Sequence, residues 1–227
     1  MQTLVVIALA GCGGGNKSPV DASIDTPLDA PIDVPPPALN CAAYCDRIQM
    51  NCKDANAQYP DAEQCTKTCA SFAVGTSTVT DTAGNTLGCR INEAVAAQTM
   101  PATHCPQAGP AGDLITAAPG HCSGGDVCMS FCTLEIIDCG SVIAPLPGNP
   151  KDSTNNALFQ YRDLGNCMTL CSAWDKTHGY STMSMGDSLA CRLSAAVTAA
   201  ISLDSAKVYC AYTTDFPTGQ CAGTASP

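Results

Sequence analysis

The strongest constraint on this chain of 227 residues is a cysteine pattern that occurs twice. Apart from Cys12, the cysteines divide into a first set of Cys41, Cys45, Cys52, Cys65, Cys69, Cys89, Cys105 and Cys122 and a second set of Cys128, Cys132, Cys139, Cys167, Cys171, Cys191, Cys210 and Cys221. The flanking residues also match, as in YPDAEQCTKTCASF against YRDLGNCMTLCSAW and GNTLGCRINEAV against GDSLACRLSAAV. The sequence therefore predicts an internal duplication, with repeat 1 at residues 41–122 and repeat 2 at residues 128–221.

Each repeat opens with three cysteines that would share one face of a helix. In CAAYCDRIQMNC and CMSFCTLEIIDC they stand at offsets 0, 4 and 11, which fall within about 40° of one another at about 100° per residue. A second helix carrying Cys-x3-Cys is expected to begin near Asp61 or Asp163, and a third after the capping signatures GNT and GDS. Because strand-like alternation is scarce, we predict an all-α fold of two disulfide-stapled modules with about three helices each.

Disulfides are expected between helices and not within one. Cysteines four residues apart on a helix have Cβ atoms about 5 to 6 Å apart, well beyond the roughly 3.8 Å of a disulfide. A short connection makes the first two helices antiparallel; the cysteine nearest the turn then remains for the third helix, and the last two close the tail. The predicted pairs are Cys41–Cys69, Cys45–Cys65, Cys52–Cys89 and Cys105–Cys122, and Cys128–Cys171, Cys132–Cys167, Cys139–Cys191 and Cys210–Cys221. We assign these bonds a stabilising role, on the order of 3 kcal/mol each, because modules this small bury little apolar surface.

The N-terminal residues carry an export feature. A short apolar run leads into LAGC at residues 9–12, which resembles the lipobox of bacterial lipoproteins. The resemblance implies that residues 1–11 are a signal peptide and that Cys12 is lipidated, with the lipid bilayer as a partner through this anchor. Gly13, in place of Asp, resembles the outer-membrane sorting pattern of enterobacterial lipoproteins. Abundant cysteine also indicates an oxidising compartment, so we expect a lipid-anchored protein of the bacterial cell envelope, at the outer membrane, facing the periplasm or the cell surface.

A low-complexity segment separates this feature from the repeats. Residues 19–34 read PVDA, SIDT, PLDA and PIDV, and three prolines follow. Frequent proline favours extended backbone, so we predict that residues 12–40 comprise the lipidated cysteine and a disordered Asp/Pro-rich tether. The regular aspartates could also form a weak calcium site, but nothing rigid would bring their carboxylates together, and a solvated tether is the preferred interpretation.

The charge balance excludes one class of partner. The chain has 20 Asp and Glu residues against 10 Lys and Arg residues, which gives a formal net charge of −10. Such a field repels nucleic acid, and no basic cluster offsets it. We therefore predict no nucleic-acid partner.

The sequence lacks the common catalytic and metal-binding signatures. Cys-x2-Cys, H-E-x-x-H, G-x-S-x-G and a phosphate-binding glycine loop do not occur in it. His104 and His121 each precede a cysteine, but a transition-metal site there would need ligands that disulfide-bonded cysteines cannot supply. His178 is interpreted as a loop residue. We predict no catalytic residue, no metal site and no cofactor, and we predict that the chain is not an enzyme.

Two features could serve recognition. Arg90 and Arg192 are matched, each directly after the cysteine that begins the third helix. The simplest interpretation is a solvated or ion-paired structural arginine, and the alternative is weak binding of an acidic ligand. An insertion at residues 140–160 is either a recognition loop or a merely tolerated insertion. The matched aromatic pairs, predicted to be core residues beside the disulfides, are Tyr44 with Phe131, Tyr59 with Tyr161, and Phe72 with Trp174.

Two resemblances concern the repeats themselves. The paired Cys-x3-Cys helices resemble the twin Cys-x3-Cys hairpins of small mitochondrial intermembrane-space chaperones, which implies hairpin geometry and no activity. Residues 41–221, with HCPQAGPAG and DTAGNTLGCR, resemble cysteine-rich tandem-repeat lipoproteins of myxobacteria and related bacteria, which implies no activity either. We predict a non-enzymatic lipoprotein that presents a helical binding surface to an envelope protein or an extracellular ligand. The alternative is an envelope protein that handles metal or thiol redox chemistry with some cysteines left as thiols.

Overall fold

The computed structural model describes residues 36–77, 81–114, 122–140, 161 and 163–223. Residues 36–227 make one compact unit, so the two repeats share a single body. The predicted signal peptide, Cys12 and nearly all of the predicted tether lie outside the described residues, as does the insertion from residue 141 onward.

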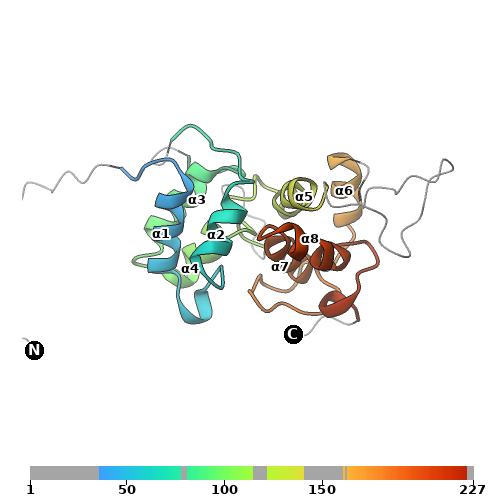
Figure 1. The fold of residues 1–227 in the computed structure, drawn as a ribbon. Coiled ribbons are helices and arrows are strands. Elements are labelled where there is room, and N and C mark those ends of the chain that lie inside the picture. The colour runs from blue at the N-terminus through green and yellow to red at the C-terminus, as the bar shows by residue number, and fades with distance from the viewer. Residues whose placement is uncertain (1–35, 78–80, 115–121, 141–160, 162, 224–227) are drawn as a thin grey trace, which may run out of the picture. The chain divides into compact units, whose positions relative to one another are not determined.

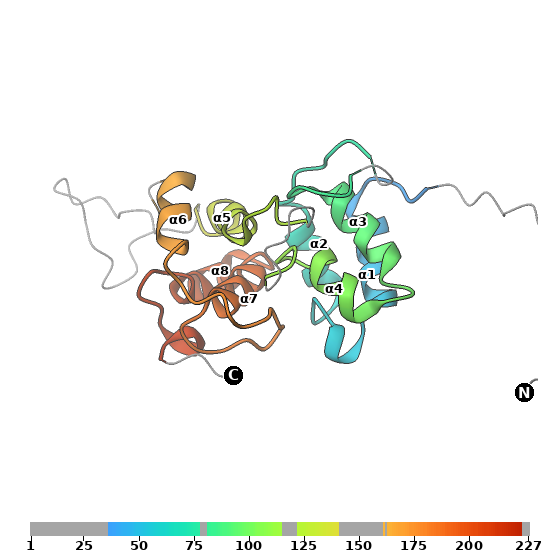
Figure 2. The same cartoon turned by 180° about the vertical axis from the view of Figure 1, so that it is seen from behind.

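The described residues form eight α-helices and no strand, which confirms the all-α prediction (Figure 1). Repeat 1 contains α1 (Cys41–Asn51), α2 (Ala62–Cys69), α3 (Leu87–Ala96) and α4 (Pro101–Ala108), with the 3-10 helix η1 (Asp54–Asn56). Repeat 2 contains α5 (Val127–Asp138), α6 (Leu164–Cys171), α7 (Leu189–Ala199) and α8 (Leu203–Tyr209), with the 3-10 helices η2 (Cys210–Tyr212) and η3 (Gly219–Cys221). In both views, α1 to α4 gather in one group and α5 to α8 in a second (Figure 2).

Each repeat has one helix more than the three expected. The fourth helix of repeat 1, α4, begins with Pro101, whose missing N–H costs nothing in a first turn, and it also contains Pro106. Its counterpart α8 begins after Ser202, whose hydroxyl accepts a hydrogen bond from the backbone N–H of Ser205. Helices this short give little periodicity, and prolines favour a loop interpretation, so the sequence pattern did not reveal them.

The predicted capping residues do begin the third helix of each repeat. The hydroxyl of Thr86 accepts a hydrogen bond from the backbone N–H of Cys89, and Ser188 does the same for Cys191. Both caps satisfy one of the four backbone donors that a helix start leaves without an intrahelical partner. The cap also fixes where the third-helix cysteine enters the core.

All sixteen cysteines of the two repeats are in disulfides, four bonds in each repeat. The bonds are Cys41–Cys69, Cys45–Cys65, Cys52–Cys105 and Cys89–Cys122 in repeat 1, and Cys128–Cys171, Cys132–Cys167, Cys139–Cys210 and Cys191–Cys221 in repeat 2. The two bonds that staple the first helix to the second are confirmed in both repeats. The other four predicted pairs are wrong: Cys52–Cys89, Cys105–Cys122, Cys139–Cys191 and Cys210–Cys221. In each repeat the four cysteines concerned are bonded to different partners than predicted, and they are so in the same way, so the two repeats keep equivalent bonds.

The direction of α3 explains the wrong pairs. The side-chain amide of Asn51 donates a 2.8 Å hydrogen bond to the carbonyl oxygen of Ala94, so the last turn of α3 lies beside the end of α1. Cys89 precedes Ala94 by five residues and is therefore roughly 7 Å further along the helix axis. The end of α1 meets α4 instead, where Cys52 and Cys105 have Cα atoms 5.6 Å apart.

The repeats pack against each other through one continuous core. Five of the six matched aromatics lie in it, as predicted, and Trp174 is partly buried and packs against it. Tyr44 meets Tyr59 and Phe72 edge to face, and Phe131 meets Trp174 at a centroid distance of 5.3 Å. Between the repeats, α2 contacts α7, and the side chain of Ser71 donates a 3.1 Å hydrogen bond to Asp138 of α5. No helix among the described residues is long and apolar enough to cross a membrane.

Candidate functional site

The matched arginines lie at the centre of the two repeats and not at the surface. The side chains of Arg90 and Arg192 are fully buried. The Arg90 guanidinium lies 4.1 Å above the ring of Phe72, and that of Arg192 lies 4.2 Å above the ring of Trp174. This burial argues against the alternative that the two arginines bind an acidic ligand and agrees with the preferred structural role. Both arginines are buried and not solvated, and Arg192 is ion-paired.

The Arg90 guanidinium is held by neutral acceptors. It donates to the carbonyl oxygens of Cys122, at 2.9 Å, and Pro110, at 3.3 Å, and to the hydroxyl of Ser130 in α5, also at 3.3 Å. Burial lowers the pKa of Arg90, because the charged form loses its hydration. The arginine thus ties the tail of repeat 1 and the first helix of repeat 2 to α3.

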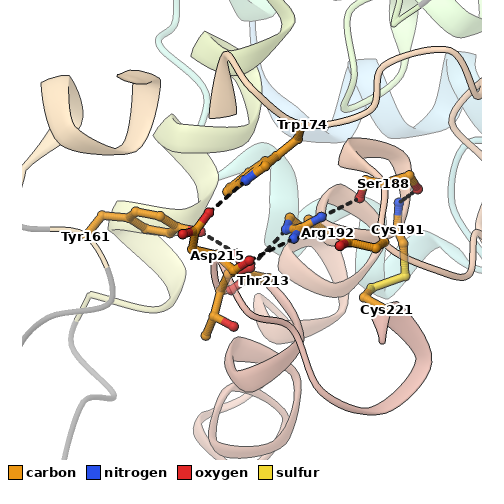
Figure 3. A network of polar contacts seen from close by, with 10 residues as sticks. Tyr161, Trp174, Ser188, Cys191, Arg192, Thr213, Asp215 and Cys221 are labelled. Atoms are coloured by element: carbon orange, nitrogen blue, oxygen red, sulfur yellow. Dashed lines mark hydrogen bonds and ion pairs between the residues drawn. A yellow bond between two sulfur atoms is a disulfide. The ribbon is translucent and has the colours of Figure 1, made fainter. Parts of the chain in front are cut away.

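Arg192 performs the same task in repeat 2 with one added charge (Figure 3). It donates to the carbonyl oxygens of Thr214, at 2.9 Å, Ser188, at 3.3 Å, and Asp215, at 3.4 Å. It also pairs with the carboxylate of Asp187 at 2.6 Å. These contacts hold the C-terminal segment against the start of α7, where the Cys191–Cys221 disulfide makes a covalent link.

Aromatic side chains complete this network. The indole N–H of Trp174 donates a 3.1 Å hydrogen bond to the carboxylate of Asp215, and the hydroxyl of Tyr161 donates to the carbonyl oxygen of Thr213 (Figure 3). The donor groups of Arg192, Trp174 and Tyr161 in this network are directed to internal acceptors. The network therefore builds the scaffold.

A pocket lies in repeat 2, in the loop between α6 and α7. It has a volume of about 250 Å³ and is lined by His178, Gly179, Ser181, Met183, Ser184, Met185, Ser188 and Ala190. Of the lining side chains, Met183 and Met185 are 81% and 59% exposed. The pocket combines one imidazole, two thioethers and several hydroxyl groups.

One wall of the pocket is oriented by a carboxylate. The Nε2 atom of His178 lies 3.2 Å from a carboxylate oxygen of Asp175. The other oxygen of Asp175 accepts hydrogen bonds from the backbone N–H and the hydroxyl of Thr177, at 2.8 and 2.7 Å. These bonds from Thr177, and to a smaller extent the nearby His178, lower the pKa of Asp175, so the carboxylate is charged at neutral pH.

The loop is fixed at several points around the pocket. The backbone N–H of Leu189 donates to the carbonyl oxygen of Asp175, and the backbone N–H of Gly186 donates to the carbonyl oxygen of Gln220. The hydroxyl of Tyr180 donates a 3.1 Å hydrogen bond to the carbonyl oxygen of Gln58 in repeat 1. The pocket is therefore held by the start of α7, the C-terminal segment and the neighbouring repeat.

The remaining candidates from the sequence do not form a site together. His104 pairs with Glu93, with Nδ1 and a carboxylate oxygen 2.7 Å apart, whereas His121 lies outside the described residues. Within the described ranges, no group of three or more His, Cys, Asp and Glu side chains could hold a metal ion. Because the sixteen repeat cysteines are all bonded, the version of the alternative hypothesis that requires free thiols among them is contradicted.

A second unusual feature is an acidic pair on α5, in which Glu135 is buried and Asp138 is half-buried. Glu135 is only 2% exposed, and burial raises its pKa to about 8. Burial also raises the pKa of Asp138 to about 6, against the opposing effect of its hydrogen bond from Ser71. Sequence reasoning missed this pair, since nothing in the spacing of two acidic residues shows which one faces the core.

The fold and its sulfur framework define the class: a disulfide-rich, all-α protein built from a duplicated module. Within it, residues 39–130 match the family described as the BfoA family C-terminal domain. The match spans repeat 1 and reaches the first turn of α5. No curated protein and no solved structure matches the chain.

Proposed function

We propose that this chain is an exported, lipid-anchored protein of the bacterial cell envelope that binds a partner without catalysing a reaction. The observation that carries the proposal is the complete use of the sixteen repeat cysteines in two identical sets of four disulfides. Such a framework persists only where thiols are oxidised, which agrees with the lipobox-like LAGC sequence and with attachment of the bilayer anchor at Cys12.

The sulfur framework acts as a scaffold for loops in this proposal. Disulfides and the two buried arginines hold short helices that bury mostly small and medium-sized side chains. Binding residues tend to lie on loops that a rigid scaffold positions. The loop around the repeat 2 pocket fits this description, and it carries two exposed methionines.

The partner is proposed to be another envelope protein or an extracellular ligand that contacts repeat 2. Besides the two loop methionines, repeat 2 exposes Phe216, at 87% of its surface. Exposed large apolar side chains are typical of interaction surfaces where they gather in one patch. The net charge of −10 argues against nucleic acid as the partner.

Metabolic labelling tests the anchor. The full chain is expressed in a bacterium with lipoprotein processing and is supplied with radioactive palmitate, beside the Cys12→Ala variant. We expect label in the wild type, recovery in the outer-membrane fraction, and loss of both in the variant. An unlabelled wild-type protein, or equal labelling of the variant, would reject lipid anchoring at Cys12.

Site-specific photocrosslinking in intact cells tests the binding surface. A photoreactive amino acid replaces Phe216 in one variant and Ala83, an exposed residue in repeat 1, in a matched control. We expect a discrete crosslinked species from position 216 and none from position 83. Absence of a crosslink at position 216, or the same species from both positions, would contradict a partner that contacts repeat 2.

A further inference from the structure

We propose that the repeat 2 pocket is a binding site for a soft monovalent metal ion, Cu(I) or its analogue Ag(I), held by His178, Met183 and Met185. All three side chains line the same pocket of about 250 Å³. The inference goes beyond the proposed function and does not depend on it, because a soluble form of the chain can be tested for metal binding alone.

The donor set selects the metal. Thioether sulfur is a soft, neutral ligand that binds Cu(I) well and hard cations such as Mg²⁺ and Ca²⁺ poorly, and imidazole suits copper as well. The usual soft ligand, cysteine thiolate, is unavailable in the repeats, since their cysteines are in disulfides. Methionine keeps its ligand atom under oxidising conditions that pair cysteines, so a thioether site suits the compartment that the disulfides indicate.

A carboxylate lies beside one ring nitrogen of the histidine. Metal-bound histidines almost always have their second ring nitrogen held by a carboxylate or carbonyl group. Here the Nε2 atom of His178 faces Asp175 at 3.2 Å, which leaves Nδ1 for a metal. The carboxylate is itself held by Thr177, so it is in place beside Nε2 before any ion binds.

The two methionines do not serve the core. Met168, elsewhere in repeat 2, packs against the hydrophobic core, whereas Met183 and Met185 are largely exposed at the pocket. Placing large apolar side chains in water is unfavourable. Coordination would give both thioethers a function and would cover part of this surface.

The aligned loop of repeat 1 lacks all three donors. Equal spacing to the flanking cysteines matches His178 with Thr76, Met183 with Asp81 and Met185 with Ala83. In repeat 1 the Asp81 carboxylate accepts hydrogen bonds from the backbone N–H and hydroxyl of Thr76 at 2.9 and 2.7 Å. The duplication therefore supplies an internal control, because the same scaffold carries one loop with soft donors and one without.

The first experiment is a competition titration with Cu(I) under anaerobic conditions. Ascorbate keeps the copper reduced without breaking the disulfides, and a coloured Cu(I) chelator reports the free ion. We expect the disulfide-bonded protein to remove one equivalent of Cu(I) from the chelator, and Ag(I) to displace it. If the protein removes no copper from the chelator, the proposal is rejected.

Matched variants locate the site. Met183→Leu/Met185→Leu keeps apolar side chains of similar size and should weaken Cu(I) binding at least a hundredfold. The control, Met50→Leu/Met100→Leu, alters two methionines that are 59% and 54% exposed outside the pocket, and it should bind as the wild type does. Equal affinity of both double variants would show that the copper binds elsewhere. Circular dichroism confirms that each variant is folded, which we expect because all four side chains are exposed.

The role of the histidine pair has its own measurements. His178→Gln removes the nitrogen ligand and should weaken binding more than tenfold, and Asp175→Asn should weaken it about tenfold through the loss of ring orientation. X-ray absorption of the Cu(I) complex should show two sulfur ligands and one nitrogen ligand. A copper bound by oxygen and nitrogen alone would overturn the thioether site even if the stoichiometry were correct.

Discussion

The two repeats share a scaffold and differ in the loop before the third helix. In repeat 1 the carboxylate of Asp81 closes this loop by accepting hydrogen bonds from the backbone N–H groups of Thr76 and Ser77. Gly88 leaves room for that carboxylate, because a methyl group there would collide with it. Repeat 2 has Met183 and Ala190 at these two positions, and both line its pocket.

The comparison shows how duplication separates stability from function. The four disulfides and the buried arginine stacked on an aromatic ring are the same in both repeats, and these features hold the helices together. In repeat 2 the internal carboxylate is Asp175, earlier in the loop, which accepts the hydrogen bonds from Thr177. Met183 stands at the position of Asp81 and lines the pocket.

A second difference lies on the first helix of each repeat. Seven residues after the first cysteine, repeat 1 has Ile48 and repeat 2 has Glu135, and both are fully buried. The core position is therefore apolar in one repeat and ionisable in the other. Asn51 and Asp138 stand in the same relation three residues later.

The largest expected effect on stability comes from making position 135 apolar, as the equivalent position 48 is in repeat 1. The raised pKa of Glu135, from 4.5 to about 8, means that the folded protein holds the proton more tightly than the unfolded chain. The contribution of Glu135 to stability is therefore fully present below pH 4.5 and is lost as the pH rises to about 8, by up to about 5 kcal/mol. Glu135→Ile, which copies repeat 1, should remove most of this decline and raise stability at pH 8.5.

Chemical unfolding at pH 5 and pH 8.5 measures this effect. Glu63→Gln, on the exposed face of α2, is the control and should leave the pH profile unchanged. The raised pKa of Asp138 acts in the same direction, so a smaller decline should persist in Glu135→Ile. A wild-type protein equally stable at both pH values would contradict the assignment.

The next effect tests the symmetry of the disulfides. Two double variants remove equivalent disulfides, Cys52→Ala/Cys105→Ala in repeat 1 and Cys139→Ala/Cys210→Ala in repeat 2. The bonded cysteines are 53 and 71 residues apart in the sequence. Loop entropy varies only with the logarithm of length, so each should lower the free energy of unfolding by about 4 kcal/mol. Guanidinium unfolding measures both. Losses that differ by more than about 2 kcal/mol would show that the two bonds are not equivalent.

The sequence was sufficient for the parts of the fold that follow from local geometry. Helical periodicity placed three cysteines on one face, and a short connection made two helices antiparallel, so the two staples joining the first two helices of each repeat were predicted correctly. The other four bonds depend on how α3 runs past α1 and on the short helices α4 and α8. That packing is tertiary, and no spacing between cysteines encodes it.

The candidate site was less accessible to sequence reasoning. His178, Met183 and Met185 match no motif, and a loop histidine is ordinary by itself. A signal was present in the alignment of the repeats, since three polar or small residues in one loop become three metal-type ligands in the other. The matched arginines were noticed in the sequence, but their environment was not predicted. Their burial against an aromatic ring depends on tertiary packing, which the sequence pattern does not show.

A smaller effect concerns the charge beside each arginine. Arg192 pairs with Asp187, whose side chain is 54% exposed, whereas repeat 1 has Asn85 at this position. Asp187→Asn should lower the free energy of unfolding by about 0.5 kcal/mol, because solvent screens the pair. Asn85→Asp should have the opposite sign, since it brings a carboxylate near a buried cation that now has neutral acceptors. Unfolding at low and high salt tests both, and a loss in both variants would contradict this account.

The smallest effect is confined to the loops. Asp81→Ala removes the acceptor for the backbone N–H groups of Thr76 and Ser77, so hydrogen exchange at these two amides should become faster while global stability stays the same. The matched change Met183→Ala should leave the exchange at Thr177 unaltered, because that amide is held by Asp175 and not by the methionine.

Exchange measured residue by residue thus separates the two kinds of loop. If Met183→Ala also released the amide of Thr177, the methionine would be a structural member of its loop, as Asp81 is. The pocket would then be a consequence of packing, and its side chains would have less freedom to bind a metal. Unchanged exchange would mean that the repeat 2 loop keeps its shape without the methionine, so selection for loop structure alone gives no reason for a thioether at that position.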